Sequence, residues 1–153
     1  PRTRITTNGL DCVNALQHLG VQRPFLVFPP WFTDAPISAG IGYFEALGFQ
    51  VGGHVKNTPD PKWDGTAPAD LYASFMHLEQ NVETLRRQIE QSCPKEADGV
   101  LIVGTGLRCV GIIDGLEQSL DRPVVTANQA SLWRCLNLAG VKAEITGYGS
   151  LLS

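Results

Sequence analysis

The sequence has few charged residues and no pattern that would bind nucleic acid or a membrane. Asp, Glu, Lys and Arg make up 18% of the 153 residues, and the formal net charge is −3. It has no basic stripe interleaved with aromatic residues, which argues against nucleic-acid binding. It also has no apolar run near the roughly 18 residues of a membrane span, and no visible signal peptide. We therefore expect a cytoplasmic protein.

Cysteine is also scarce, and the four cysteines form no metal-binding pattern. No C-x-x-C pair occurs and no histidine stands at ligand spacing from them, so a zinc site is not expected. With 43% hydrophobic residues the chain can bury a core without disulfides. We expect reduced and mostly structural thiols at Cys12, Cys93, Cys109 and Cys135.

Two kinds of apolar pattern alternate along the chain. Short runs rich in branched and aromatic residues predict buried strands at 25–28, 49–55, 100–103 and 123–126. Between them, helical spacing predicts helices from about residues 9, 34, 68, 107 and 127, of which 68–89 is a single helix of five turns. The alternation predicts right-handed crossovers and an α/β fold: a parallel four-stranded sheet flanked by helices, in a flavodoxin- or Rossmann-like three-layer arrangement.

Polar groups and glycines gather where the predicted strands end. The carboxyl ends of parallel strands share one edge, at which ligands bind. The segments 6–8, 29–31, 104–106 and 126–129 bring hydroxyls, amides, an indole and backbone N–H groups to that edge, a set that suits a carboxylate. The candidate substrate-binding residues are Thr6, Thr7, Asn8, Pro30, Trp31, Gly104, Thr105, Gly106 and Asn128.

Other chemistry-bearing residues are less clearly placed. Trp63 stands in a turn-rich loop at 56–66 and either covers a pocket or anchors the loop. The G-T-G at 104–106 lacks the third glycine of a dinucleotide fingerprint. Cys109, near the predicted helix start, is a weak catalytic candidate, because a helix N-terminus favours a thiolate; a small core residue is the simpler interpretation.

Three stretches resemble the C-terminal part of the aspartate/glutamate racemase superfamily. They read G-V-L-I-V-G-T-G-L-R at 99–108, R-P-V-V-T-A-N-Q-A-S-L-W-R-C-L-N-L-A-G at 122–140, and G-Y-G-S-L-L at 147–152. The most similar branch is maleate cis-trans isomerase and arylmalonate decarboxylase. The resemblance implies one half of a two-domain racemase-like fold, with the active site between the halves and no metal or organic cofactor.

This resemblance also implies how the chain is organised. Residues 1–153 form a single α/β domain, in which Arg2–Asn8 continue a linker from a missing N-terminal half. The tail at 141–153 is expected to pack on a partner domain or subunit, and a homo-oligomer is expected. The small carboxylate substrate would bind between the two halves.

At the residue that matters most, the sequence departs from the family. Each half of a family member can contribute a cysteine, and the second cysteine falls on Gly104. The active-site tyrosine of the family falls on Trp31, whereas Thr105 keeps the hydroxyl of the family's C-T pair. A loop asparagine of the isomerases finds no secure counterpart, although Asn57 is near.

The resemblance implies a cofactor-independent isomerase, racemase or decarboxylase. It would act on a small carboxylate or dicarboxylate through an enediolate or cysteine acid/base chemistry, and this chain alone would be inactive. Gly104 and Trp31 favour an alternative, a catalytically inactive carboxylate-binding relative that serves as a sensor or accessory protein. A flavodoxin-like regulatory or nucleotide-binding domain would need an acid cluster or a phosphate loop, and the sequence has neither.

Overall fold

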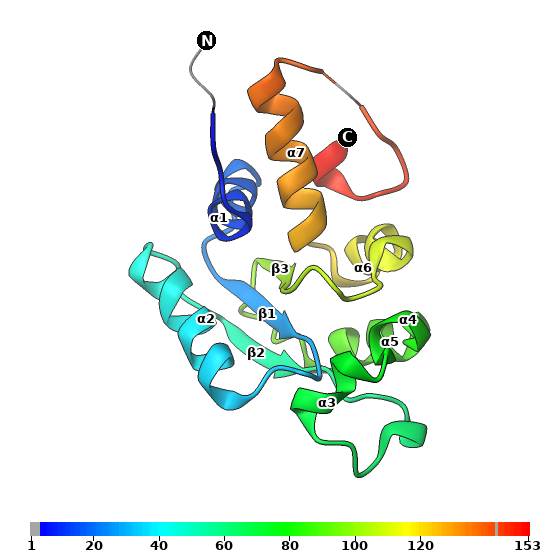
Figure 1. Ribbon diagram of the computed structural model, residues 1–153. Coiled ribbons are helices and arrows are strands. Elements are labelled where there is room, and N and C mark those ends of the chain that lie inside the picture. The colour runs from blue at the N-terminus through cyan, green and yellow to red at the C-terminus, as the bar shows by residue number, and fades with distance from the viewer. Residues whose placement is uncertain (1–3, 143) are drawn as a thin grey trace.

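The centre of the protein is a four-stranded sheet in which all neighbouring strands are parallel (Figure 1). The computed structural model describes residues 4–142 and 144–153. The strand order is β2-β1-β3-β4, so β1 and β3 are central and β2 and β4 lie at the edges. The strands are β1 (Pro24–Phe28), β2 (Gly53–Lys56), β3 (Gly99–Ile102) and β4 (Val124–Thr126).

Burial separates β2 from the other strands. Every residue of β1, β3 and β4 is buried, as expected of parallel strands with helices on both faces. β2 is only partly buried, which agrees with the edge position that Gly52 and Gly53 indicate. Its paired residues are 53–56, however, rather than the predicted 49–55, because the chain before Gly53 joins the sheet only through single hydrogen bonds from Gln50 and Gly52.

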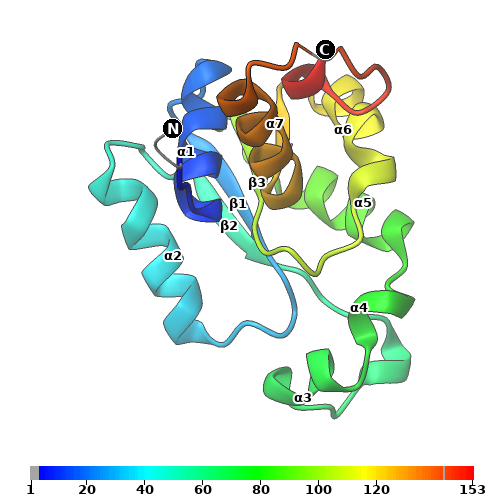
Figure 2. The same cartoon turned by 45° about the horizontal axis from the view of Figure 1, so that its top comes forward.

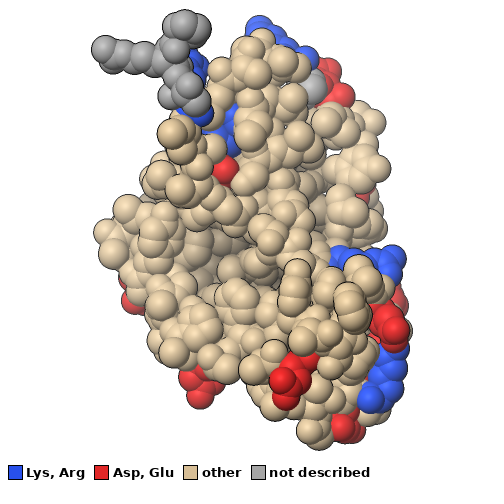
Figure 3. All heavy atoms as spheres, viewed as in Figure 1, with Lys and Arg blue, Asp and Glu red and all other residues tan. Residues whose placement is uncertain are grey.

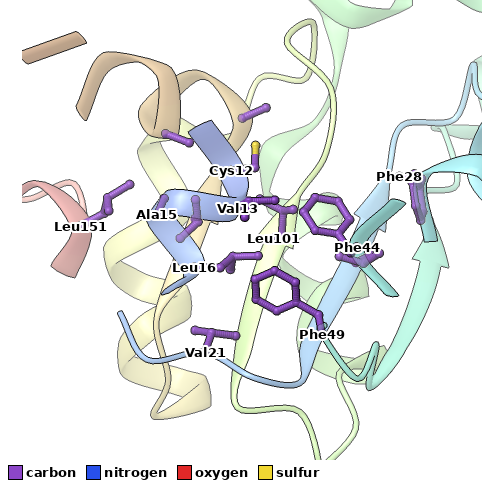
Figure 4. Close-up of a cluster of buried hydrophobic side chains, with 14 of the residues drawn as sticks. Cys12, Val13, Ala15, Leu16, Val21, Phe28, Phe44, Phe49, Leu101 and Leu151 are labelled. Atoms are coloured by element: carbon purple, nitrogen blue, oxygen red, sulfur yellow. The ribbon is translucent and has the colours of Figure 1, made fainter. Parts of the chain in front are cut away.

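Helices cover both faces of the sheet and create two separate core clusters (Figure 2). On one face, α1, α2 and α7 pack around Phe28 and Leu101 (Figure 4). On the other face, α5 and α6 pack around Val27 and Val100. This is the predicted three-layer architecture. The helices are α1 (Asn8–His18), α2 (Asp34–Ala46), α5 (Val82–Ser92), α6 (Ile113–Leu120) and α7 (Ala127–Ala139).

The stretch predicted as a single helix over 68–89 is three helices. Two short ones, α3 (Pro68–Ala73) and α4 (Met76–Glu79), precede α5. Phe75 interrupts the run with a φ of +61°, in the left-handed region that a helix cannot contain. The Phe75 and Leu78 side chains are exposed, so the apolar spacing that suggested one buried stripe did not reflect burial.

A local signal for the true start of α5 is present in the sequence. The Asn81 side chain accepts hydrogen bonds from the N–H groups of Glu83 and Thr84, which is the contact that defines an N-cap. An N-cap in the middle of an apolar pattern marks the end of one helix and the beginning of another.

The helix predicted to begin at residue 107 also begins later. Leu107 is buried in the cluster beneath α5 and α6, and its burial holds residues 103–109 in a loop. A 3-10 turn, η2 (Val110–Ile112), then leads into α6 at Ile113. The glycine turn is therefore not followed directly by a helix N-terminus.

The C-terminal tail packs on its own chain. Leu151 in η3 (Ser150–Leu152) belongs to the core cluster around α1 and α7. The Glu117 carboxylate accepts hydrogen bonds from the N–H and hydroxyl of Ser150, and the Asp114 carboxylate accepts one from the Gly149 N–H. Packing of the tail on a partner subunit stays a prediction. The predicted linker at 2–8 lies partly outside the described residues.

Two properties of the described part of the chain bear on function. Across residues 4–142 and 144–153, no helix is long and apolar enough to cross a membrane. In the same ranges, no group of three or more His, Cys, Asp or Glu side chains is arranged to hold a metal ion.

Candidate functional site

A cavity of about 600 Å³ lies where the connections of the sheet change direction. From β1 the chain crosses to β2 on one side, and from β2 it crosses back over β1 to β3 on the other. Parallel sheets leave a crevice at such a switch point, beyond the carboxyl ends of the two central strands. Residues that follow β1 and β3 line the cavity accordingly. Its lining is Asn8, Trp31, Phe32, Ala69, Tyr72, Val103, Gly104, Thr105 and Gly106.

The floor of the cavity is the glycine turn after β3. Gly104 has a φ of +89°, a conformation that glycine adopts without the cost that a Cβ imposes. No acceptor in the described ranges takes a hydrogen bond from the N–H of Gly104, Thr105 or Gly106. Successive unpaired N–H groups in a turn can bind an anion. The turn thus offers backbone donors in place of a reactive side chain.

Aromatic side chains form one wall of the cavity. The Trp31 and Tyr72 rings meet edge to face with centroids 5.3 Å apart. Both close over Gly106: a Cβ at that position would lie 2.8 Å from Tyr72 Cε2 and 3.2 Å from Trp31 Cζ2. Gly106 is therefore required for this closure because any side chain there would push the rings away.

Tyr72 belongs to a covering segment, residues 57–80, which crosses from β2 to α5 and contains α3 and α4. Leu71 and Met76 are buried and anchor it. At its start, the Gln88 side chain bonds both the N–H and the carbonyl of Thr58. Near its end, Arg108 Nη1 donates to the Leu78 carbonyl at 2.8 Å. These contacts hold Tyr72 beside the glycine turn.

The opposite side of the cavity is organised around the buried carboxylate of Asp11. This side chain is 1% exposed and accepts hydrogen bonds from the Thr6 hydroxyl and from Ser131 Oγ. Asn8 Nδ2 donates to Ser131 Oγ at 2.9 Å and to the Ala127 carbonyl at 2.7 Å. The network ties the start of α1 to the start of α7 and fixes Asn8 at the cavity.

The predicted site residues divide into two groups. Those that line the cavity are Asn8, Trp31, Gly104, Thr105 and Gly106. The others lie nearby without lining it: Thr6 donates to Asp11, Thr7 caps α1, Pro30 is buried, and the Asn128 side chain donates to the Thr105 carbonyl at 3.0 Å. Asn128 thus supports the turn. Whether any of these residues binds a substrate stays a prediction.

The structure corrects the expected cap of α7 and excludes Trp63, whose role was left open, as a cover of this cavity. The N-cap of α7 is Thr126, which forms a reciprocal capping box with Gln129, rather than the segment 127–129. Trp63 lies in η1 (Pro61–Trp63), with Lys62 Nζ 5.3 Å above its ring, and it does not line the cavity. The aromatic cover comes from Tyr72 instead.

The cysteines do not supply a thiol to the cavity. Cys109 is buried, its Sγ contacts the Leu107 carbonyl, and burial raises the pKa of its thiol to about 12. It lies before the 3-10 turn and not one turn into a helix. Burial, together with the Asp11 carboxylate, raises the pKa of Cys12 to about 12. Burial also raises the pKa of Cys93, against the opposing effect of Arg122. Cys135 is exposed.

We expect iodoacetamide at pH 8 to modify Cys135 in the folded protein and to spare Cys12 and Cys109. A pKa of about 12 instead of 9.0 lowers the thiolate fraction about a thousandfold. Mass spectrometry of labelled peptides measures the rates, and the denatured chain, in which all four thiols should react, is the control. Rapid labelling of Cys109 in the folded protein would restore it as a catalytic candidate.

The charge distribution matches a site built from neutral donors. No residue that lines the cavity carries a formal charge. On the face shown in Figure 3, charged side chains lie mainly along the margins and the centre is largely uncharged. Arg108 lines a neighbouring hollow of about 510 Å³, which shares Thr105 and Gly106 with the cavity. An anion in the cavity would therefore be held by dipoles rather than by a cation.

Phe32, Ala69, Tyr72 and Val103 also line the cavity but were not among the predicted site residues. Phe32 follows Trp31 directly, so the end of β1 was a sufficient signal. Ala69 and Tyr72 fall in the stretch interpreted as one amphipathic helix, and this interpretation hid their place at the cavity.

Solved structures share this fold over nearly the whole chain. The maleate isomerase Iso from Pseudomonas putida S16 matches 99% of the chain with a TM-score of 0.80 and 20% identity. An arylmalonate decarboxylase matches 96% with a TM-score of 0.74 and 23% identity. A cysteine-to-serine variant of the Nocardia farcinica maleate cis-trans isomerase, solved with a covalently bound succinylcysteine intermediate, matches 93% with a TM-score of 0.64 and 19% identity.

The chain spans only part of these proteins. It covers 56%, 60% and 53% of the three solved chains, in the order given above. No curated protein sequence matches it. The family model of arylmalonate decarboxylase matches residues 75–152, about half of the chain, a region that includes β3, the glycine turn, β4 and α7. The fold is the parallel sheet with flanking helices that the sequence predicts. The match to the family model shows that the protein belongs to the arylmalonate decarboxylase family.

Proposed function

We propose that this chain is one half of a cofactor-independent enzyme that acts on a small mono- or dicarboxylate through an enediolate, with decarboxylation favoured over two-base racemisation. The observation that carries the proposal is the turn at 104–106, which lines a cavity without charged side chains and whose N–H groups bond no acceptor among the described residues. Donors of this kind stabilise negative charge that develops on oxygen.

The proposed chemistry follows from the carboxylate that the N–H groups of the turn could bind. In a malonate-like substrate, one carboxylate would bind to the N–H groups of the turn. The bond to the other carboxylate breaks, carbon dioxide leaves, and the electron pair forms an enediolate on the retained carboxylate. A single acid then protonates the α-carbon. Gly104 has no side chain that could act on the substrate, and one acid protonates one face only.

The aromatic wall supports a substrate with a flat apolar group. Trp31, Phe32 and Tyr72 line the same cavity as the turn, and aromatic rings bind planar groups by stacking or edge contacts. An aryl malonate presents both features, a carboxylate and a ring. The second half of the enzyme, outside these residues, would close the open side of the cavity and bring further groups.

The test uses the complete protein that contains this chain. We expect phenylmalonate to be converted to phenylacetate and carbon dioxide, followed by ¹H NMR, and to bind more tightly than maleate or aspartate in calorimetry. In D₂O the product should carry one deuterium at the α-carbon. Binding without turnover or α-carbon exchange for any of the three compounds would contradict an enzymatic role.

A second function, carboxylate binding without catalysis, is favoured by Gly104 itself. The family position that can hold a cysteine has no side chain here, and the nearest thiol, Cys109, is buried and protonated. Such a protein would be a sensor or accessory protein. The same calorimetry identifies it by a binding signal in the absence of any product.

A further inference from the structure

We propose that Tyr72 is the catalytic acid on the glycine-turn side of this site, delivering its hydroxyl proton to the α-carbon of the enediolate. This inference rests on the proposed function. It assigns a role to Tyr72, a side chain of the covering segment that no sequence motif indicates.

The groups available in the cavity restrict the choice of the acid. Apolar side chains and glycines make up most of the lining, and four lining side chains carry an N–H or O–H: Asn8, Trp31, Tyr72 and Thr105. Asn8 uses its amide hydrogens on Ala127 and Ser131. An indole N–H and an aliphatic hydroxyl are not acids of useful strength. Among the four, Tyr72 alone carries a phenolic O–H, the kind of hydroxyl that serves as a general acid.

The position of the Tyr72 hydroxyl also suits the role of an acid. A Cβ on Gly106 would meet Tyr72 Cε2 at 2.8 Å, and the ring carbon bonded to Cε2 carries the hydroxyl. The hydroxyl therefore lies beside the turn whose N–H groups are offered to the substrate. No described residue accepts a hydrogen bond from it, and the side chain is 49% exposed. It is thus free to donate to a ligand and reaches water.

Neighbouring rings fix the orientation of the Tyr72 ring. Tyr72 stacks on His77 with centroids 4.3 Å apart and an interplanar angle of 15°. Trp31 meets it edge-on and also packs against His77, with 6.2 Å between the Trp31 and His77 ring centroids. The Arg108 contact with the Leu78 carbonyl holds the end of the covering segment close to the turn. The Tyr72 ring cannot swing away without loss of its contacts with Trp31 and His77.

Water is the only co-reactant of the step. The electron pair left on the α-carbon forms a C–H bond with the Tyr72 proton as the O–H bond breaks. The enediolate returns to a carboxylate, and the tyrosinate takes a proton from water at the open side of the cavity, leaving a hydroxide that combines with the released carbon dioxide as bicarbonate. One substrate molecule thus yields one product molecule with a single new hydrogen.

The test is Tyr72→Phe in the complete protein, with phenylmalonate as the probe. Phenylalanine keeps the ring contacts and removes only the hydroxyl, so we expect kcat to fall about a hundredfold or more and KM to stay within about threefold. Tyr148→Phe is the matched control because the described contacts of Tyr148 use its backbone carbonyl, bonded to Gln129; its kcat should equal that of the wild type.

Each other result overturns the assignment. Equal kcat values for Tyr72→Phe and wild type would leave the proposed function intact and remove Tyr72 from the chemistry. A raised KM with unchanged kcat would make Tyr72 a binding residue only. Absence of turnover by the wild-type protein would overturn both the proposed function and the role of Tyr72.

Discussion

Replacement of Asp11 by alanine is expected to lower the free energy of unfolding by about 3 kcal/mol. The carboxylate is 1% exposed and is the acceptor for the Thr6 and Ser131 hydroxyls. Its removal leaves these half-buried donors without their acceptor and loses hydrogen bonds to a charged group. Chemical denaturation followed by circular dichroism measures the change. Asp11→Asn, which keeps an acceptor oxygen and the volume, should lose less.

Asp34→Ala is the matched control. Asp34, like Asp11, is an acidic residue in the first turn of a helix, but it is exposed. Its loss should cost at most about 1 kcal/mol, the size of a helix-dipole contribution. Equal losses in the two variants would mean that Asp11 acts only as a partner of the helix dipole and would contradict the importance of the network.

Replacement of Gly106 by alanine is expected to weaken phenylmalonate binding by the complete protein by about 30-fold, which is on the order of 2 kcal/mol. The new Cβ would meet Tyr72 Cε2 at 2.8 Å and Trp31 Cζ2 at 3.2 Å. The Tyr72 ring cannot yield alone because it is stacked on His77. The aromatic wall should therefore move outward and the cavity should lose its shape.

Calorimetry gives the affinity, and hydrogen exchange shows whether amides of α3 and α4 exchange faster. Gly111→Ala serves as the control, since a Cβ there meets no atom within 4 Å, and it should bind as the wild type does. Unchanged affinity in Gly106→Ala would mean that closure of the rings over the turn does not shape the binding site.

The parts of the fold that can be predicted from the sequence are those whose composition is most strongly constrained by burial. The runs at 25–28 and 100–102 are fully buried in the sheet, so they contain only apolar residues and are easily recognised. The helix predicted over 68–89 shows the opposite case. Phe75 and Leu78 fit its spacing yet are exposed, because spacing reports where apolar residues stand and not whether another element covers them.

The candidate site was predictable at its floor and not at its cover. The turn at 104–106 directly follows a buried strand, and strand ends in a parallel sheet must share an edge. Tyr72 reaches the same cavity only because the chain bends at Phe75 and because Arg108 holds the Leu78 carbonyl. Such contacts between distant segments leave no periodic trace in a sequence. The Asp11–Ser131 contact is hidden for the same reason.

The conformation of Gly104 makes a side chain difficult to introduce at this position. A cysteine there would have to adopt a φ of +89°, and its Cβ would lie 3.3 Å from Pro29 Cγ. The left-handed backbone alone costs a residue with a side chain about 1–2 kcal/mol. A single substitution could introduce a thiol here but not a backbone that suits it. The turn and Pro29 would have to change with it, so a thiol at this position would require several coordinated substitutions.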